Sequence, residues 1–193
     1  NRRSTIIERI PIKFNAVYGD FDVSYNNIKN LNNFPRFISG SLICRSNRLE
    51  TLSGSVKYAN SIIASNNRIS SLVGCPKVLI KLDVDHNLLT NLVGCPEGIE
   101  VSVNSNRLKS LRGLNNSKIL RLDTSYLPYI IRNSKIPYFI DSVCKWQNEY
   151  SIWDNNDSLN MYRFNEMIRD IESDCRSTIR ETFRPNIGVY MSI

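Results

Sequence analysis

Residues 62–96 read IIASNNRISSLVGCPKVLIKLDVDHNLLTNLVGCP, and this stretch contains the pentapeptide LVGCP twice, at 72–76 and at 92–96. A catalytic motif is rarely duplicated at so short an interval, whereas a structural period repeats in this way. Upstream of each LVGCP lies a matching octapeptide, IIASNNRI at 62–69 and LDVDHNLL at 82–89. The interval of twenty residues therefore predicts one repeated structural unit.

The octapeptide pattern continues in both directions along the chain. Comparable segments are FDVSYNNI (21–28), LICRSNRL (42–49) and VSVNSNRL (101–108). Each segment has a small apolar residue three positions before its asparagine and an apolar residue two positions after it. The asparagines are Asn26, Asn47, Asn67, Asn87 and Asn106, and the leucines five positions after them are Leu31, Leu52, Leu72, Leu92 and Leu111. The segment LRLDTSYL (120–127) begins a degenerate sixth unit, in which Tyr126 disturbs the pattern and the asparagine is lost.

The pattern L-x-L-x-x-N-x-L at a period of about twenty residues resembles the leucine-rich-repeat family. The LVGCP corners and the short unit are similar to the repeats of bacterial and tailed-phage proteins, and the resemblance covers roughly residues 15–126. It implies an α/β solenoid with a parallel β-sheet on its concave face. By the same resemblance, such proteins bind other proteins through the concave face.

Elementary physical chemistry leads to the same architecture. Apolar and polar residues alternate before each asparagine, which is typical of a strand with one buried face. Stacked units would pair these strands into a parallel sheet, and each asparagine would lie where the chain leaves it. Its amide can bond backbone groups that the turn leaves unpaired. A unit of twenty residues is too short for a full convex helix, so the sequence predicts turns or extended segments there.

The two ends of a solenoid need covers, because each end exposes apolar surface. Residues 1–14 are expected to form the N-terminal cap, with a short helix or strand within 4–16, and residues 15–127 the solenoid. Residues 128–193 are expected to form a helical C-terminal cap. They contain an apolar segment at 137–153 and an amphipathic periodicity from 158 to about 183, which Pro185 ends. The alternative interpretation of 128–193 is a separate helical module that binds a partner.

Composition and charge limit the function classes. Apolar residues are 41% and charged residues 22%, which is typical of a globular chain with no membrane span. The net charge of +7 is uneven, because residues 1–126 carry 17 Lys/Arg against 9 Asp/Glu and residues 127–193 carry 8 against 9. Five cysteines, an odd number, favour free thiols in a reducing compartment. The chain begins with Asn1, which fits either proteolytic maturation or a trimmed start.

Strand residues that point away from the core form the expected concave binding face. These positions are mostly polar, with an apolar patch and an acidic spot. Because acids repel phosphates, this face is a poor site for nucleic acid. The candidate partner-binding residues are Asp22, Tyr25, Ile43, Arg45, Ile63, Asn66, Asp83, Asp85, His86 and Asn104.

No constellation in the sequence predicts catalysis, a cofactor or a metal. His86 is the only histidine, and one histidine with Asp83 and Asp85 does not complete a coordination shell or an acid–base pair. Cys75 and Cys95 should stack about 5 Å apart at neighbouring corners. They are interpreted as small buried residues rather than as a metal or redox pair.

A basic rim, formed by Arg48, Arg68 and Arg107, is expected directly after the asparagines. Arginines at strand spacing suit phosphates or an acidic protein surface, although the same residues also serve as a solvated edge. The sequence thus predicts a non-enzymatic protein-binding module. The resemblance further implies a phage protein, either a virion component or a factor that binds a host protein, located in the host cytoplasm or the virion. The alternatives are polyanion or nucleic-acid binding through the basic rim, and an effector with activity in 128–193.

Overall fold

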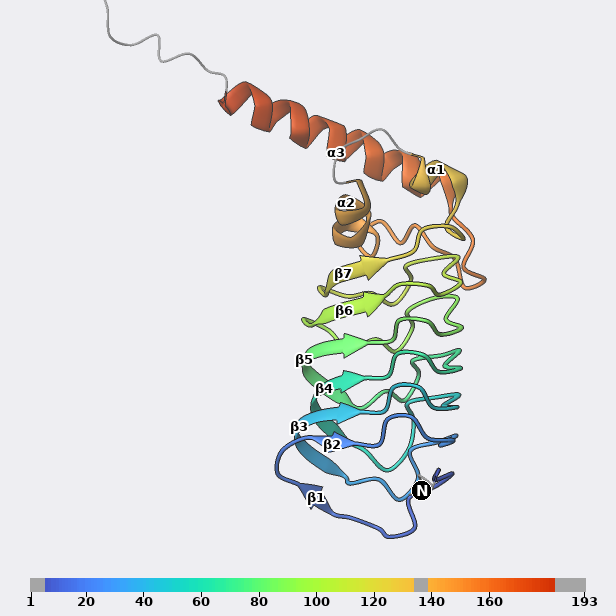
Figure 1. The fold of residues 1–193 in the computed structure, drawn as a ribbon. Helices are drawn as coiled ribbons and strands as arrows, with labels where there is room; N and C mark the ends of the chain where they lie inside the picture. The colour runs from blue at the N-terminus through green and yellow to red at the C-terminus, as the bar shows by residue number, and fades with distance from the viewer. Residues whose placement is uncertain (1–5, 134–138, 183–193) are drawn as a thin grey trace, which may run out of the picture.

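The computed structural model describes residues 6–133 and 139–182, with side chains described for residues 6–133 and 140–173. The chain winds into stacked turns, and each turn contributes one strand or strand pair to a single parallel sheet (Figure 1). The strands are β1 (Ala16–Val17), β2 (Phe21–Asp22), β3 (Phe37–Ile43), β4 (Tyr58–Ile63), β5 (Lys77–Asp83), β6 (Glu100–Val103) and β7 (Lys118–Leu122). The helices are α1 (Tyr129–Arg132), α2 (Phe139–Trp146) and α3 (Met161–Thr182).

The sheet follows the order of the chain, β1-β3-β4-β5-β6-β7, and β2 also pairs with β3. All described strand pairs are parallel. The repeat that the sequence predicts is therefore confirmed as a parallel-sheet solenoid. Opposite the strands, the returning segments of the described units are turns and irregular chain rather than helices.

The core is a column of apolar side chains that runs through every turn. Leu42, Ile62, Leu82 and Val101 point inward from successive strands, and each is completely buried. The five closing leucines that follow the asparagines are likewise 0% exposed. Burial of one leucine side chain contributes about 2 kcal/mol. Neighbouring turns thus hide each other's apolar faces.

The asparagines form a ladder of amides between the turns. Asn67 accepts a hydrogen bond from the Leu49 amide of the preceding turn at 2.9 Å. Its Nδ2 group donates to the carbonyl oxygens of Cys44 and Ala64, at 3.0 and 3.1 Å. Equivalent bonds repeat at the other described rungs, Asn47, Asn87 and Asn106. Each side chain thereby pairs backbone groups of two turns at once.

A residue with positive φ precedes each ladder asparagine. The φ angles of these residues lie between 52° and 58°, in the left-handed region that L side chains rarely adopt. The residues are Tyr25, Ser46, Asn66, His86 and Ser105. The sequence does not predict these positive φ angles, because only one of the five residues is an asparagine and none is glycine. The left-handed residue lies directly before the asparagine whose amide joins two turns.

The N-terminal segment continues the solenoid and forms no helix or strand over residues 6–14. The Ile7 amide donates to Asn26 Oδ1 at 2.9 Å, and the Asn27 amide donates to the Ile7 carbonyl. Ile28 makes the same two contacts with the next turn, through Asn47 and Arg48. The expected helix or strand is thus replaced, in the described part, by the second half of one further turn. Ile10 completes this turn as a buried core residue.

The C-terminal segment lies against the last turn of the solenoid (Figure 1). Val143 of α2 and Phe164 and Met167 of α3 are buried in the same hydrophobic cluster as the closing leucines. Gln147 and Asn148 donate to the Leu114 carbonyl, at 3.3 and 2.9 Å. In the apolar segment at 137–153, Trp153 is buried and Trp146 is partly buried, while Tyr138 lies outside the described residues.

A carboxylate clasp connects the loop before α3 to two corners of the solenoid. Asp157 accepts hydrogen bonds from Arg112 Nε at 2.8 Å, Ser110 Oγ at 3.0 Å and Asn91 Nδ2 at 2.7 Å. Partial burial alone would raise the pKa of Asp157, but the hydrogen bonds from Asn91, Arg112 and Ser110 together hold it below its usual value. The clasp therefore stabilises the charged carboxylate.

Substitution of one ladder asparagine tests whether its amide stabilises the fold. We expect Asn67→Asp to lower the free energy of unfolding by about 2–3 kcal/mol, because a carboxylate cannot donate to the Cys44 and Ala64 carbonyls. Urea denaturation measures the loss. The matched control is Asn66→Gly, at an exposed position with φ of 58°, where glycine should change stability by less than about 0.5 kcal/mol. Wild-type stability in Asn67→Asp would contradict the ladder.

The clasp predicts a dependence of stability on pH. The pKa of Asp157 in the folded state lies below the unfolded value of about 3.9. The contribution of the clasp to the free energy of unfolding is therefore complete above about pH 3.9 and is lost as the pH falls through the folded-state pKa. We expect Asp157→Asn to cost about 1 kcal/mol near neutral pH. The difference from wild type should shrink as denaturation series are extended toward pH 3. Glu149→Gln, at an exposed acid nearby in sequence, is the control; a difference that is independent of pH would count against the clasp.

Candidate functional site

The side chains of the sheet that point away from the core form one continuous surface, here called the outward sheet face. Strand register places the middle positions of successive turns in a single row. This row reads Asp22, Ile43, Ile63, Asp83, Ser102 and Arg121. A second row lies two residues later along each turn and contains Arg45, Asp85 and Asn104. The side chains in these rows differ in character between the N-terminal and the C-terminal half of the sheet.

The N-terminal half of the outward sheet face is apolar and cationic. Ile43 and Ile63 are paired neighbours in register and are half-buried. The Arg45 guanidinium lies 5.8 Å from the centre of the Tyr25 ring, which is a cation–π contact. Tyr25 itself is 70% exposed. An aliphatic pair beside an exposed aromatic ring and an arginine has the composition of a protein-binding surface.

Asp22 stands at the end of this half and is fixed by its neighbour. Its Oδ1 atom accepts hydrogen bonds from both the hydroxyl and the amide of Ser24. These two bonds, the side-chain bond first, hold the pKa of Asp22 below its usual value. The carboxylate is therefore charged and oriented at neutral pH.

The acidic half is a closed network rather than an open acidic spot. Asp85 is only 3% exposed; its Oδ1 accepts from Ser102 Oγ at 2.7 Å and from the Asn104 amide at 2.8 Å. Arg121 forms an ion pair with Asp85 at 2.9 Å and a longer one with Asp83 at 3.9 Å. Arg121 Nε also donates to Ser102 Oγ. Asp83 and Asp85, which the sequence assigns to partner binding, are thus buried and paired at this end of the sheet.

Sequence reasoning missed Arg121 because the sixth unit lacks the ladder asparagine, and the predicted binding face covers only the five units that have one. Val103 pairs with Leu122, so the position equivalent to Asn106 is Ser125. A register shift in β7 absorbs the extra residue at Leu120. The buried Leu127, two positions after Ser125, was the available signal, since every earlier unit has an apolar residue there.

The remaining candidate residues lie at the end of the sheet. Asn66 and His86 are exposed and hold the left-handed positions that precede the ladder. Within the described residues, no hydrogen bond or ion pair connects the His86 imidazole to Asp83 or Asp85. The described part of the chain also contains no group of three histidine, cysteine or acidic side chains placed to hold a metal ion.

The basic rim lies beside the ladder, directly after its asparagines. Arg48, Arg68 and Arg107 each donate their backbone N–H to the preceding turn, at 2.8 to 2.9 Å, and Leu88 occupies the position between Arg68 and Arg107. All three arginines are exposed, and none forms an ion pair with another residue of the described chain. The leucine interrupts the column, so only Arg48 and Arg68 occupy adjacent turns.

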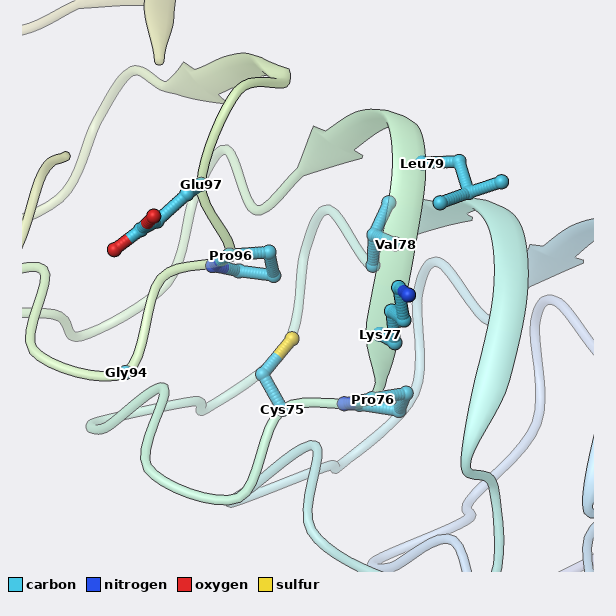
Figure 2. A pocket seen from close by; sticks show the side chains of 8 residues that line it. All are labelled: Cys75, Pro76, Lys77, Val78, Leu79, Gly94, Pro96 and Glu97. Atoms are coloured by element: carbon cyan, nitrogen blue, oxygen red, sulfur yellow. The ribbon is translucent and has the colours of Figure 1, made fainter. Parts of the chain in front are cut away.

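The cysteines of the two LVGCP corners lie at the side of the solenoid. Cys95 is buried, and Cys75 borders a cleft beside β5 (Figure 2). Burial raises the pKa of Cys75 to about 12, and the nearby Cys95 adds to the shift; burial likewise raises the pKa of Cys95 to about 12. Thiols protonated so far above neutral pH are poor nucleophiles and poor metal ligands. They fit the interpretation as small packing residues.

Comparison with known proteins adds no assignment to this geometry. No protein family matches the chain, and neither the curated proteins nor the solved structures contain a significant match. Within the part of the chain that the structure describes, no helix has the length and apolar character needed to cross a membrane.

Proposed function

We propose that the chain is a leucine-rich-repeat protein of the short-repeat type found in bacterial and tailed-phage proteins. The support is the coincidence of the repeated L-x-L-x-x-N-x-L pattern with a ladder of asparagine amides between parallel turns. Residues 128–193 act in this proposal as a helical C-terminal cap. The buried contacts of Val143, Phe164 and Met167 with the solenoid core support that role.

The function that the geometry favours is non-catalytic binding of a protein through the outward sheet face, which corresponds to the concave face of such repeats. One observation carries the proposal: Ile43 and Ile63 lie side by side on the sheet, partly exposed and framed by Tyr25 and Arg45. A parallel sheet held by the ladder is rigid, so few side chains would lose freedom on binding. The partner, following the sequence resemblance, is a host protein or another virion component.

Substitution of the aliphatic pair tests this proposal. We expect the double variant Ile43→Lys and Ile63→Lys to lose binding at least about tenfold, because two charges would be placed in the apolar centre of the interface. The measurement is capture of proteins from host lysate by immobilised chain, followed by titration of each captured protein. The control is Ser70→Lys, at an exposed turn. Equal capture by the double variant and the control would contradict the proposal.

A second candidate function is binding of a polyanion along the basic rim. It rests on the exposure of Arg48, Arg68 and Arg107 and on the lack of ion pairs to them within the described chain. The acidic network does not compete with it, because Arg121 already neutralises part of the charge of Asp83 and Asp85.

Salt dependence distinguishes this candidate from protein binding through the sheet. We expect any affinity for a labelled single-stranded oligonucleotide to fall steeply with salt, and the triple variant Arg48→Glu, Arg68→Glu and Arg107→Glu to abolish it. Fluorescence anisotropy at two salt concentrations measures both effects. The double variant of Ile43 and Ile63 serves here as the control and should bind like wild type. An affinity that the triple reversal leaves unchanged would exclude the rim.

A further inference from the structure

The sheet narrows abruptly between β5 and β6. β5 spans seven residues, Lys77–Asp83, and β6 spans four, Glu100–Val103. Pairing between them begins only at Lys81 and Glu100. On its other side, β5 pairs with β4 from Lys77 onward. The first half of β5 is therefore paired on one side only, although it lies inside the sheet and not at its end (Figure 1).

The backbone groups along this half have a defined direction. The Lys77 amide donates toward β4, to the Lys57 carbonyl at 3.0 Å. Because the groups of successive strand residues point to opposite sides, the N–H and C=O of Val78 point toward the β6 side. No residue of the described chain pairs with Val78 on that side. The first half of β5 is thus a short free strand edge.

A cleft lies along this edge (Figure 2). It measures about 450 Å³ and runs between β5 and the loop that replaces the start of β6. Its lining residues are Cys75, Pro76, Lys77, Val78, Leu79, Gly94, Pro96 and Glu97. Pro96 cannot donate a hydrogen bond to the edge, because proline has no amide hydrogen. Gly98, with φ of 69°, then turns the loop before β6 begins.

Apolar side chains are exposed beside the free edge. The pairing between β4 and β5 shifts register after Val78, so that β5 has two residues, Leu79 and Ile80, where β4 has one. They are 48% and 52% exposed. The charged residues that line the cleft, Lys77 and Glu97, have opposite signs. A ligand that suits this site offers an extended backbone and apolar side chains and carries no large net charge.

We propose that the cleft binds a short extended segment of a protein partner, which adds a parallel or antiparallel strand to the free edge of β5. The partner segment would bond the Val78 backbone and pack apolar side chains on Leu79, Ile80 and Pro96. This mode of recognition uses main-chain hydrogen bonds for affinity and side-chain contacts for specificity. The inference rests on the proposed function, since it assigns part of the protein partner to a particular place beside the outward sheet face.

Amide hydrogen exchange tests the free edge directly. Ala59 occupies the same register position in β4 as Val78 does in β5, and the two residues are 0% and 3% exposed, respectively. Ala59 has a strand on each side. We expect the Val78 amide to exchange at least about a hundredfold faster than the Ala59 amide, since it lacks a hydrogen-bond acceptor. Equal protection of the two amides would overturn the proposal.

A peptide selection tests the docking. Random short peptides displayed in a library are selected on the wild-type chain and counter-selected on Leu79→Lys/Ile80→Lys. The matched control is Leu88→Lys, at an exposed leucine away from the cleft. We expect selected peptides to protect the Val78 amide and to lose at least about tenfold in affinity on backbone N-methylation, which removes one donor and blocks strand pairing. Peptides that bind without protecting Val78, or a selection that yields none sensitive to the Leu79/Ile80 change, would overturn the proposal.

The two proposals fail in different ways. If the cleft binds nothing but the Ile43/Ile63 variant still loses its captured partner, only the strand-addition site is wrong. If neither variant affects capture, the proposed function itself fails. Both conclusions require that the Leu79→Lys/Ile80→Lys variant folds like wild type, which circular dichroism measures. We expect it to do so because both side chains are already exposed.

Discussion

The structure depends on the side-chain amide that joins each turn to the one before it. Where the chain leaves a strand, backbone carbonyls and an amide would be buried without partners, and such groups destabilise a fold by several kcal/mol over a repeat array. An asparagine satisfies both kinds of group at once, since its oxygen accepts and its nitrogen donates. Asn47, Asn87 and Asn106 do so while 9%, 4% and 3% exposed, respectively. No other side chain of that length offers both functions, and this explains why the position repeats while its neighbours vary.

Much of this was open to prediction from the sequence, because the ladder and the closing leucines recur with one period. The strands, their parallel order and the row that contains Ile43 and Ile63 all follow from stacking equal units. The left-handed residues before the asparagines did not follow, since Tyr25 and His86 are not residue types that announce positive φ. The repeat geometry imposes that conformation on whatever residue stands there. Likewise, Ile7 and Ile10 alone do not identify residues 6–14 as the second half of a repeat unit. The assignment depends on their contacts with the next turn.

Long-range contacts account for the parts that the sequence did not reveal. The sixth unit lacks the ladder asparagine, yet its strand places Arg121 beside Asp85. Asp85 therefore becomes buried and paired, although alternation alone places it on an open face. Long-range pairing of this kind depends on which turn is adjacent, and a local pattern of alternating residues carries no information on it. The same reasoning applies to Asp157, which meets Arg112 from 45 residues away.

The step between β5 and β6 shows how a change of period also creates a recognition surface. The two LVGCP corners are identical in sequence, yet Pro76 is followed at once by a strand, whereas Pro96 is followed by three further residues before β6 begins. Identical corners therefore lead to strands of different length, and the longer strand keeps backbone groups that its neighbour does not satisfy. A solenoid normally shows free strand edges only at its two ends, where caps cover them. An edge inside the array has no cap, so its backbone groups bond either water or a partner. Pairing with a partner strand is more favourable here than hydration, because Leu79 and Ile80 are exposed beside that edge. Strand addition would cover these apolar side chains and pair the backbone in one step.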